Sequence, residues 1–199
     1  MIEIINLSKK YGELAVFEKF NLEIEESEIT CILGRSGCGK STLLNIIAGL
    51  IPFDKGEIKG VDYNRISYIF QDPRLLPWLT ALENVKLVLL SLEEPKIAEK
   101  TAARYLEMVG LKEYYDFYPH QLSGGMKQRV AIARAFAYPS DLLLMDEPFK
   151  GLDIELKENL ISSFLDIWAK QKKTVVFVTH EIEDAEKIGH KLINISNLT

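Results

Sequence analysis

The chain has 199 residues, of which 47% are hydrophobic and 27% are charged, and its formal net charge at pH 7 is -5. A chain of this length buries one good core with room for a subdomain, but hardly for two independent domains. The acidic balance argues against a nucleic-acid partner, which usually needs a basic face. No apolar run approaches the roughly 18–20 residues that a membrane span requires.

The N-terminus has no basic region followed by an apolar run, so we expect no signal peptide. Cys31 and Cys38 lack the spacing and the histidine partners of a metal site. We therefore expect both cysteines to be free thiols in a protein of the cytoplasm.

Short apolar runs bounded by turn residues predict strands at residues 2–6, 17–24 and 28–33. The last strand leads into Gly34-Arg35-Ser36-Gly37-Cys38-Gly39-Lys40-Ser41, and a largely buried helix is predicted at 42–50. Strand, glycine-rich loop and helix form the context in which G-x-x-x-x-G-K-S binds phosphate. The glycines let backbone N–H groups turn inward, Lys40 adds a positive charge, and the Ser41 hydroxyl can reach Mg²⁺.

Two more short strands are predicted at 57–58 and 66–70, and a helical block follows. Its helices are expected at 81–92, from Pro95 to a stop at Gly110, and from Ser123 to a point before Pro139. We expect this block, about 74–138, to be a subdomain inserted between α/β segments 1–73 and 139–199. The turn Ser123-Gly124-Gly125 opens a helix and is a second anion site, although the chain has a single phosphate loop. Each such turn is therefore expected to complete the nucleotide site of a second copy.

The chain then returns to α/β alternation, with strands predicted at 142–145, 174–178 and 192–195 and helices around 156–167 and 182–188. Ligands of parallel sheets bind beyond the carboxyl ends of the strands. Gly34, Asp146, Glu147 and His180 all fall at such ends. From there Asp146 can hold the hydration shell of Mg²⁺, and Glu147 can orient or deprotonate an attacking water.

For four further side chains, the sequence allows two interpretations each, one functional and one structural. Gln71 contacts Mg²⁺ or the attacking water through its amide, or is a surface glutamine. His180 donates a hydrogen bond to the γ-phosphate, or is structural. Tyr11, beside Gly12, stacks on an adenine ring or lies on a surface turn. Cys38 is a reactive thiolate favoured by the helix N-terminus and Lys40, or a passive small side chain.

Together these motifs resemble the nucleotide-binding subunit of ATP-binding cassette (ABC) transporters, over nearly the whole chain. The resemblance implies an α/β fold: a P-loop NTPase (RecA-like) core with a mostly parallel sheet, a trimmed antiparallel β subdomain and an inserted α-helical signature subdomain. It also implies hydrolysis of ATP with Mg²⁺. The resemblance assigns single residues as follows: Tyr11 stacks on the adenine, Gln71 is the Q-loop glutamine, Asp146 ends Walker B, Glu147 is the catalytic glutamate and His180 is the switch histidine. Walker A comprises Gly34, Arg35, Ser36, Gly37, Cys38, Gly39, Lys40, Ser41 and Thr42. The signature comprises Leu122, Ser123, Gly124, Gly125, Met126 and Gln128, and the D-loop includes Leu152 and Asp153. The implied ligands of Mg²⁺ are Ser41, Gln71 and Asp146, and the implied catalytic residues are Glu147, His180 and Gln71.

Residues 70–78 and 119–126 look like those of bacterial importers of the nitrate, sulfonate and taurine type. That branch implies a second copy, transmembrane permease subunits and an extracytoplasmic solute-binding protein as partners, with no nucleic acid. The chain is then expected to lie on the inner face of the cell membrane through the permease. The alternative is an ABC ATPase that acts as a signalling or scaffold module, which only its partner would distinguish.

The chain departs from the family pattern in three places. Lys150-Gly151 stands before Leu152-Asp153, where the family has small residues. The stretch between Gly56 and Phe70 is short, and the chain stops soon after its last predicted strand, so we expect no C-terminal regulatory domain.

Overall fold

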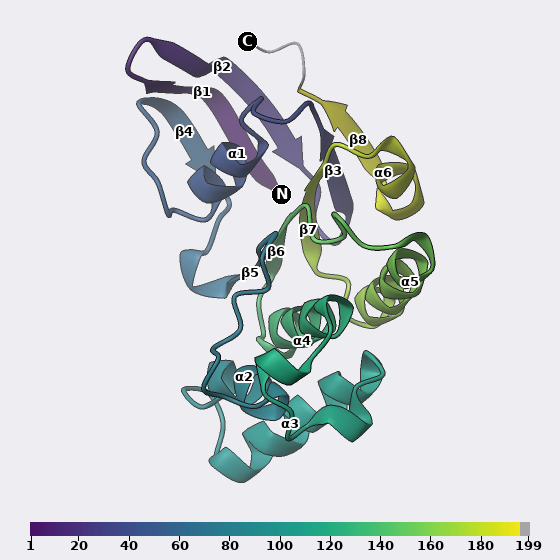
Figure 1. Ribbon diagram of the computed structural model, residues 1–199. Coiled ribbons are helices and arrows are strands. Elements are labelled where there is room, and N and C mark those ends of the chain that lie inside the picture. The colour runs from purple at the N-terminus through teal and green to yellow at the C-terminus, as the bar shows by residue number, and fades with distance from the viewer. Residues whose placement is uncertain (196–199) are drawn as a thin grey trace. The chain divides into compact units, whose positions relative to one another are not determined.

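The computed structural model describes residues 1–195 (Figure 1). These residues divide into two compact units, which we describe separately. Unit 1 comprises Met1–Tyr68, Asp141–Glu147 and the described residues from Lys172 onward, and unit 2 comprises Ile69–Ser140 and Pro148–Gln171.

A five-stranded sheet forms the centre of unit 1. Its strand order is β5 (Ile66–Ile69), β6 (Leu142–Asp146), β7 (Thr174–Thr179), β3 (Ile29–Leu33) and β8 (Lys191–Asn194). The pairs β6–β7, β7–β3 and β3–β8 are parallel. All six residues of β7 are buried, as expected for a parallel strand that is covered on both faces.

A three-stranded antiparallel sheet completes unit 1, in the order β2 (Leu14–Ile24), β1 (Ile2–Tyr11) and β4 (Lys55–Lys59). Strands β1 and β2 are longer than the sequence predicted, because they pair with each other as far as Tyr11 and Leu14. The helices of unit 1 are α1 (Lys40–Ile47), η1 (Tyr63–Arg65) and α6 (Ile182–Ile188). Side chains of α1 pack with residues of both sheets into one hydrophobic core, which includes Leu43, Leu44, Phe17, Leu144 and Val176.

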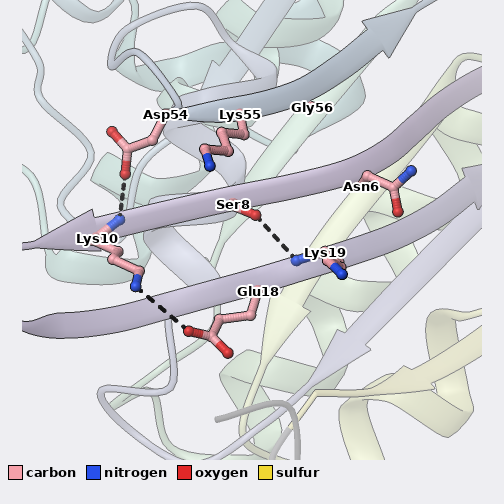
Figure 2. Close-up of a pocket in the computed structure, with 8 residues that line it drawn as sticks. All are labelled: Asn6, Ser8, Lys10, Glu18, Lys19, Asp54, Lys55 and Gly56. Carbon is pink, nitrogen blue, oxygen red and sulfur yellow. Dashed lines mark hydrogen bonds and ion pairs between the residues drawn. The ribbon is translucent and has the colours of Figure 1, made fainter.

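An open hollow of about 960 Å³ lies over the antiparallel sheet. Figure 2 shows the residues that line it. Polar side chains line it, and several of them are already engaged. Lys10 Nζ lies 3.7 Å from Glu18 Oε1, and the Lys10 backbone N–H donates a 2.7 Å hydrogen bond to Asp54 Oδ2. None of the residues that line the hollow was predicted as a site residue, and we assign it no role.

Unit 2 is helical. Its elements are α2 (Ala81–Lys86), η2 (Leu87–Leu89), α3 (Pro95–Met108), η3 (Lys112–Tyr114), η4 (Pro119–Gln121), α4 (Gly124–Ala137) and α5 (Ile154–Gln171). Helix α2 begins with a capping box between Thr80 and Glu83. It ends at Lys86 and continues as the tighter η2, so the single helix predicted at 81–92 is wrong in length. Both Leu92 N–H and Glu93 N–H turn back to the Leu89 carbonyl, which ends the helical run before Pro95.

An aromatic cluster joins α4, α5 and the segment before α5. The ring centroid of Phe164 lies 5.7 Å from that of Phe136 and 6.4 Å from that of Phe149. This packing accounts for residues 148–171 grouping with the helical block, whereas the sequence analysis assigned them to the α/β segment. Within residues 1–195, no helix combines the length and apolarity needed to span a bilayer.

Candidate functional site

The loop at residues 34–39 turns the chain from β3 directly into α1. Gly39 has φ 98° at the N-cap of α1, and a Cβ atom there would lie 2.5 Å from Val16 Cγ1 and 3.0 Å from Phe17 Cζ. Both the backbone conformation and the close packing therefore require glycine. The first N–H groups of a helix have no intrahelical partner, so the loop and the start of α1 form an anion site beyond the carboxyl end of β3.

Lys40 is the first residue of α1, and it is buried with 5% of its surface exposed. Its ammonium donates hydrogen bonds to the carbonyl oxygens of Gly34, at 2.8 Å, and Arg35, at 3.1 Å. It also lies 3.4 Å from Glu147 Oε1. A buried charge needs such partners, and these contacts hold the ammonium at the phosphate loop.

Ser41 and Asp146 meet beside this lysine. Ser41 Oγ donates a 3.0 Å hydrogen bond to Asp146 Oδ1 at the end of β6. Among residues 1–195 there is no group of three or more histidine, cysteine or acidic side chains that could hold a metal ion. Mg²⁺ commonly takes one or two protein oxygens and completes its shell with phosphate oxygens and water. The Ser41–Asp146 pair fits that kind of shared site.

Glu147 lies between two potential partners. It is 8% exposed, and its Oε2 lies 3.0 Å from His180 Nδ1, while Oε1 faces Lys40. Its φ is 43°, a left-handed conformation that is uncommon for a non-glycine residue and that clusters at functional sites. A hydrogen bond of 3.0 Å from its N–H to the Val178 carbonyl helps to fix that conformation. Unit 1 therefore gathers Lys40, Ser41, Asp146, Glu147 and His180 at the carboxyl ends of β3, β6 and β7.

The Ser-Gly-Gly turn in unit 2 is open on one side and packed on the other. Ser123 is the N-cap of the 14-residue helix α4, and its Oγ accepts a 3.3 Å hydrogen bond from Met126 N–H. Ser123 and Gly124 are exposed, and a Cβ added to Gly124 would meet nothing within 4 Å. A Cβ added to Gly125 would instead lie 2.4 Å from Leu156 Cδ2. The serine and the first glycine thus present the helix N-terminus to a ligand, while the second glycine fixes the turn against α5.

The predicted D-loop lies in the same unit. Asp153 Oδ1 accepts a 2.9 Å hydrogen bond from Leu156 N–H and so caps the start of α5. Because Leu156 also packs under Gly125, the turn and the D-loop share one support. Leu156 was predicted only as part of a helical face, and nothing in its sequence context marks this role.

The remaining predicted residues are placed differently. Tyr11 ends β1 with 51% of its surface exposed, and Lys9 Nζ lies 5.0 Å from its ring centroid. Gln71 is exposed and lies in unit 2. Gln128 is only 3% exposed, and its Nε2 has no hydrogen-bond partner within the described residues. Its side chain therefore does not share the open face of Ser123.

Comparisons with known proteins identify the family. The profile described as ABC transporter matches residues 17–150. The bicarbonate transport ATP-binding protein CmpD of Synechocystis is 42% identical over 212 residues, which cover 98% of this chain and 74% of CmpD. The aliphatic sulfonates import ATP-binding protein SsuB of Bacillus cereus is 41% identical over 196 residues, which cover 95% of this chain and 77% of SsuB.

A solved structure supports the same conclusion. It is a dimeric, post-hydrolysis structure of an ATP-binding cassette with ADP and Pi, and it matches with a TM-score of 0.85 at 35% identity, covering 98% of this chain and 94% of the other. The similarity confirms the predicted fold class, a P-loop NTPase core with a parallel and an antiparallel sheet and a helical block. The chain belongs to the ABC transporter family and is an ATP-hydrolysing cassette of that family.

Proposed function

We propose that this chain is the ATP-hydrolysing subunit of a bacterial importer and that it works as an ATP-dependent homodimer beneath a membrane permease. The observation that carries the proposal is the contact of the Glu147 carboxylate with both Lys40 and His180, next to the hydrogen-bonded pair Ser41 and Asp146 in unit 1. That group offers a cation for the phosphates, two oxygen ligands for Mg²⁺ and a carboxylate that can activate water, but it lacks a second anion donor.

The nucleotide would be held along the phosphate loop. Residues 34–42 supply backbone N–H groups and the Lys40 ammonium to the phosphates, and Tyr11 stacks on the adenine ring. Ser41, Asp146 and Gln71 would hold Mg²⁺, which neutralises charge on the phosphate oxygens. The 3.0 Å approach of Ser41 Oγ to Asp146 Oδ1 supports the first two of these assignments.

Hydrolysis then requires one activated water. Glu147 takes a proton from that water as its oxygen attacks the γ-phosphorus and the bond to the bridging oxygen breaks. His180 holds the Glu147 carboxylate in place and contacts the γ-phosphate. Gln71 orients the same water through its amide.

The missing anion donor comes from a second copy. The turn Ser123-Gly124-Gly125 of one copy meets the γ-phosphate held by Lys40 of the other; Ser123 and Gly124 are exposed there, which supports this assignment, and Gly125 holds the turn in place. Leu122, Met126 and Gln128 belong to the same motif, and we propose that the buried Gln128 supports the turn rather than touching nucleotide. Leu152 and Asp153 lie at the seam between the copies. Loss of phosphate removes the charge that joins them, and they separate.

The membrane partner is assigned from the importer resemblance, and the names of the bicarbonate and sulfonate relatives support it. Residues 71–78 are the proposed docking surface for a permease, and Trp78 on this segment is 68% exposed. The chain would then lie at the inner face of the cell membrane, with an extracytoplasmic solute-binding protein on the other side. Within the chain we propose one ABC ATPase domain, residues 1–199, with a helical subdomain at about 74–138.

A complementation experiment tests the shared site. Lys40→Ala removes the phosphate-loop lysine, and Ser123→Arg blocks the turn, so each variant alone should not hydrolyse ATP. Mixed dimers carry one intact site, so mixing the two variants should restore part of the wild-type rate. No recovery in a mixture that light scattering shows to form ATP-dependent dimers would contradict the proposal.

A second experiment tests the partner. The tagged chain, purified from membranes in mild detergent, should retain a multi-span membrane protein that mass spectrometry identifies, and vesicles containing both should take up solute with ATP. A retained membrane protein that moves no solute would favour the signalling or scaffold alternative.

A further inference from the structure

The segment at residues 73–80 in unit 2, which we call the Trp78 segment, connects the residues after β5 to α2 without regular secondary structure. Segments of this kind are normally mobile, because few backbone groups find partners within them. Here a buried side chain from α2 and a half-buried side chain from α4 supply those partners.

Asn84 on α2 is the first of these side chains, and only 1% of its surface is exposed. Its Oδ1 accepts a 2.8 Å hydrogen bond from Leu76 N–H. Its Nδ2 lies within hydrogen-bond distance of the carbonyl oxygens of Leu76, at 3.2 Å, Leu79, at 3.0 Å, and Thr80, at 2.9 Å. One amide therefore serves both ends of the turn that carries Trp78.

Arg134 in the last turn of α4 is the second. Its guanidinium donates a 2.8 Å hydrogen bond to the Pro73 carbonyl and a 3.0 Å hydrogen bond to the Arg74 carbonyl. Arg74 has φ 47°, and its own guanidinium lies 3.7 Å from the centroid of the Phe70 ring. The start of the segment is thus fixed by a fork of two charge-assisted hydrogen bonds.

We infer that Asn84 and Arg134 are positioning residues that hold the Trp78 segment rigidly on unit 2, so that Trp78 is a preformed anchor for the permease. The second half of this inference rests on the proposed function. Ser123 is the N-cap of α4 and Arg134 lies in its last turn, so one helix connects the turn that meets nucleotide to the arginine that binds the Trp78 segment. An event at the turn is therefore passed to the segment as a rigid-body movement of unit 2.

The energetics favour a fixed anchor over a loose one. Tryptophan is enriched among the few interface residues that carry most of the binding energy. Ordering a loop on binding lowers affinity, so a loop held before binding retains more of that energy. Removing the Asn84 amide would take away the printed partner of the Leu76 N–H and of the Leu79 carbonyl, whereas the carbonyls of Leu76 and Thr80 would keep their backbone hydrogen bonds from Leu79 N–H and Asn84 N–H. The segment would then exchange between conformations.

The chain supplies its own probe, since it has two tryptophans, of which Trp168 is buried. In a Trp168→Phe background, time-resolved fluorescence anisotropy reports on Trp78 alone. We expect slow decay with the parent chain and an added nanosecond component in Asn84→Leu and Arg134→Met. Arg134→Lys keeps the charge but not the fork and should restore the slow decay only in part.

Gln171→Leu is the matched control. Gln171 also links helices of unit 2 through its amide, at 2.6 Å to Tyr105 Oη, but it is not bonded to the Trp78 segment. It should lower the denaturation midpoint without changing the anisotropy of Trp78. An unchanged anisotropy in Asn84→Leu and Arg134→Met would overturn the inference, and so would an equal change in Gln171→Leu, because the effect would then be general loosening.

The role of Trp78 as an anchor for the permease is tested by measuring ATP hydrolysis with and without the permease in phospholipid vesicles. Without permease, Asn84→Leu should hydrolyse ATP at a rate within about twofold of wild type. With permease, it should lose most of the stimulation: the affinity for the permease should fall on the order of tenfold, which corresponds to about 1.4 kcal/mol for one lost anchor. Full stimulation despite a mobile Trp78 would overturn that role. If wild type itself is not stimulated, the proposed partner is wrong, and the anisotropy still decides whether the two residues position the segment.

Discussion

Replacing Glu147 by glutamine should tighten the binding of ATP while it abolishes hydrolysis. Glu147 Oε1 lies 3.4 Å from Lys40 Nζ, and the carboxylate is therefore the counter-ion of the lysine in the nucleotide-free chain. An arriving γ-phosphate must take over that ammonium and must also approach the Glu147 charge. Glutamine keeps the shape of the side chain and removes both obstacles.

The size of the effect follows from the contact that is lost. A hydrogen bond to a charged group exceeds a neutral one by about 1 kcal/mol, which corresponds to about fivefold in affinity. Hydrolysis should fall by about 10²-fold or more, because the general base is removed. Binding and hydrolysis therefore change in opposite directions in one variant, which simple damage to the site cannot produce.

Titration calorimetry with ATP measures the affinity. The parent chain and each variant also carry Ser123→Arg, which keeps them monomeric, so that the heat of dimer formation does not add to the heat of ATP binding. Glu183→Gln on α6 is the control, because it removes one exposed carboxylate of unit 1 outside the site. An unchanged or weaker affinity in Glu147→Gln would refute the argument that this carboxylate competes with nucleotide for the lysine.

Three further changes have defined outcomes. Ser123→Arg should abolish turnover while the monomer still binds ATP in calorimetry, and loss of binding would mean that the serine acts within its own chain. Gly125→Ala should lower the unfolding free energy by about 1–3 kcal/mol in urea denaturation, because the new methyl group overlaps a leucine. Gly124→Ala is its control and should have no such effect, and equal losses would contradict the packing. Alkylation of Cys38 should block ATP binding and be slowed by Mg-ATP, whereas burial raises the pKa of Cys31 to about 12 and leaves it unreactive. Equal rates at Cys38 with and without nucleotide would defeat the prediction.

The sequence predicted most of the α/β elements because their signals are local. Four apolar residues before Asp146 predict a buried strand, and glycines before Lys40 predict a loop that leads into a helix. Helix α6 begins and ends where the pattern indicated, at Ile182–Ile188. These elements set the positions of the site residues in unit 1, so their grouping could also be predicted.

Features that depend on distant contacts were not predicted. The full length of β1 depends on pairing with β2. The burial of Gln128 and the hydrogen bonds from Asn84 to the Trp78 segment depend on how helices pack within unit 2. A motif match names such residues by type, but it carries no information about which side chain faces inward.

The central claim is that one ATP is held by the phosphate loop of one copy and the Ser-Gly-Gly turn of another. A crystal structure of Glu147→Gln with Mg-ATP measures this directly. We predict two copies, with Ser123 Oγ of one within hydrogen-bond distance of the γ-phosphate that Lys40 of the other holds. An ATP enclosed by a single chain, with every Ser123 remote from any nucleotide, would contradict the account.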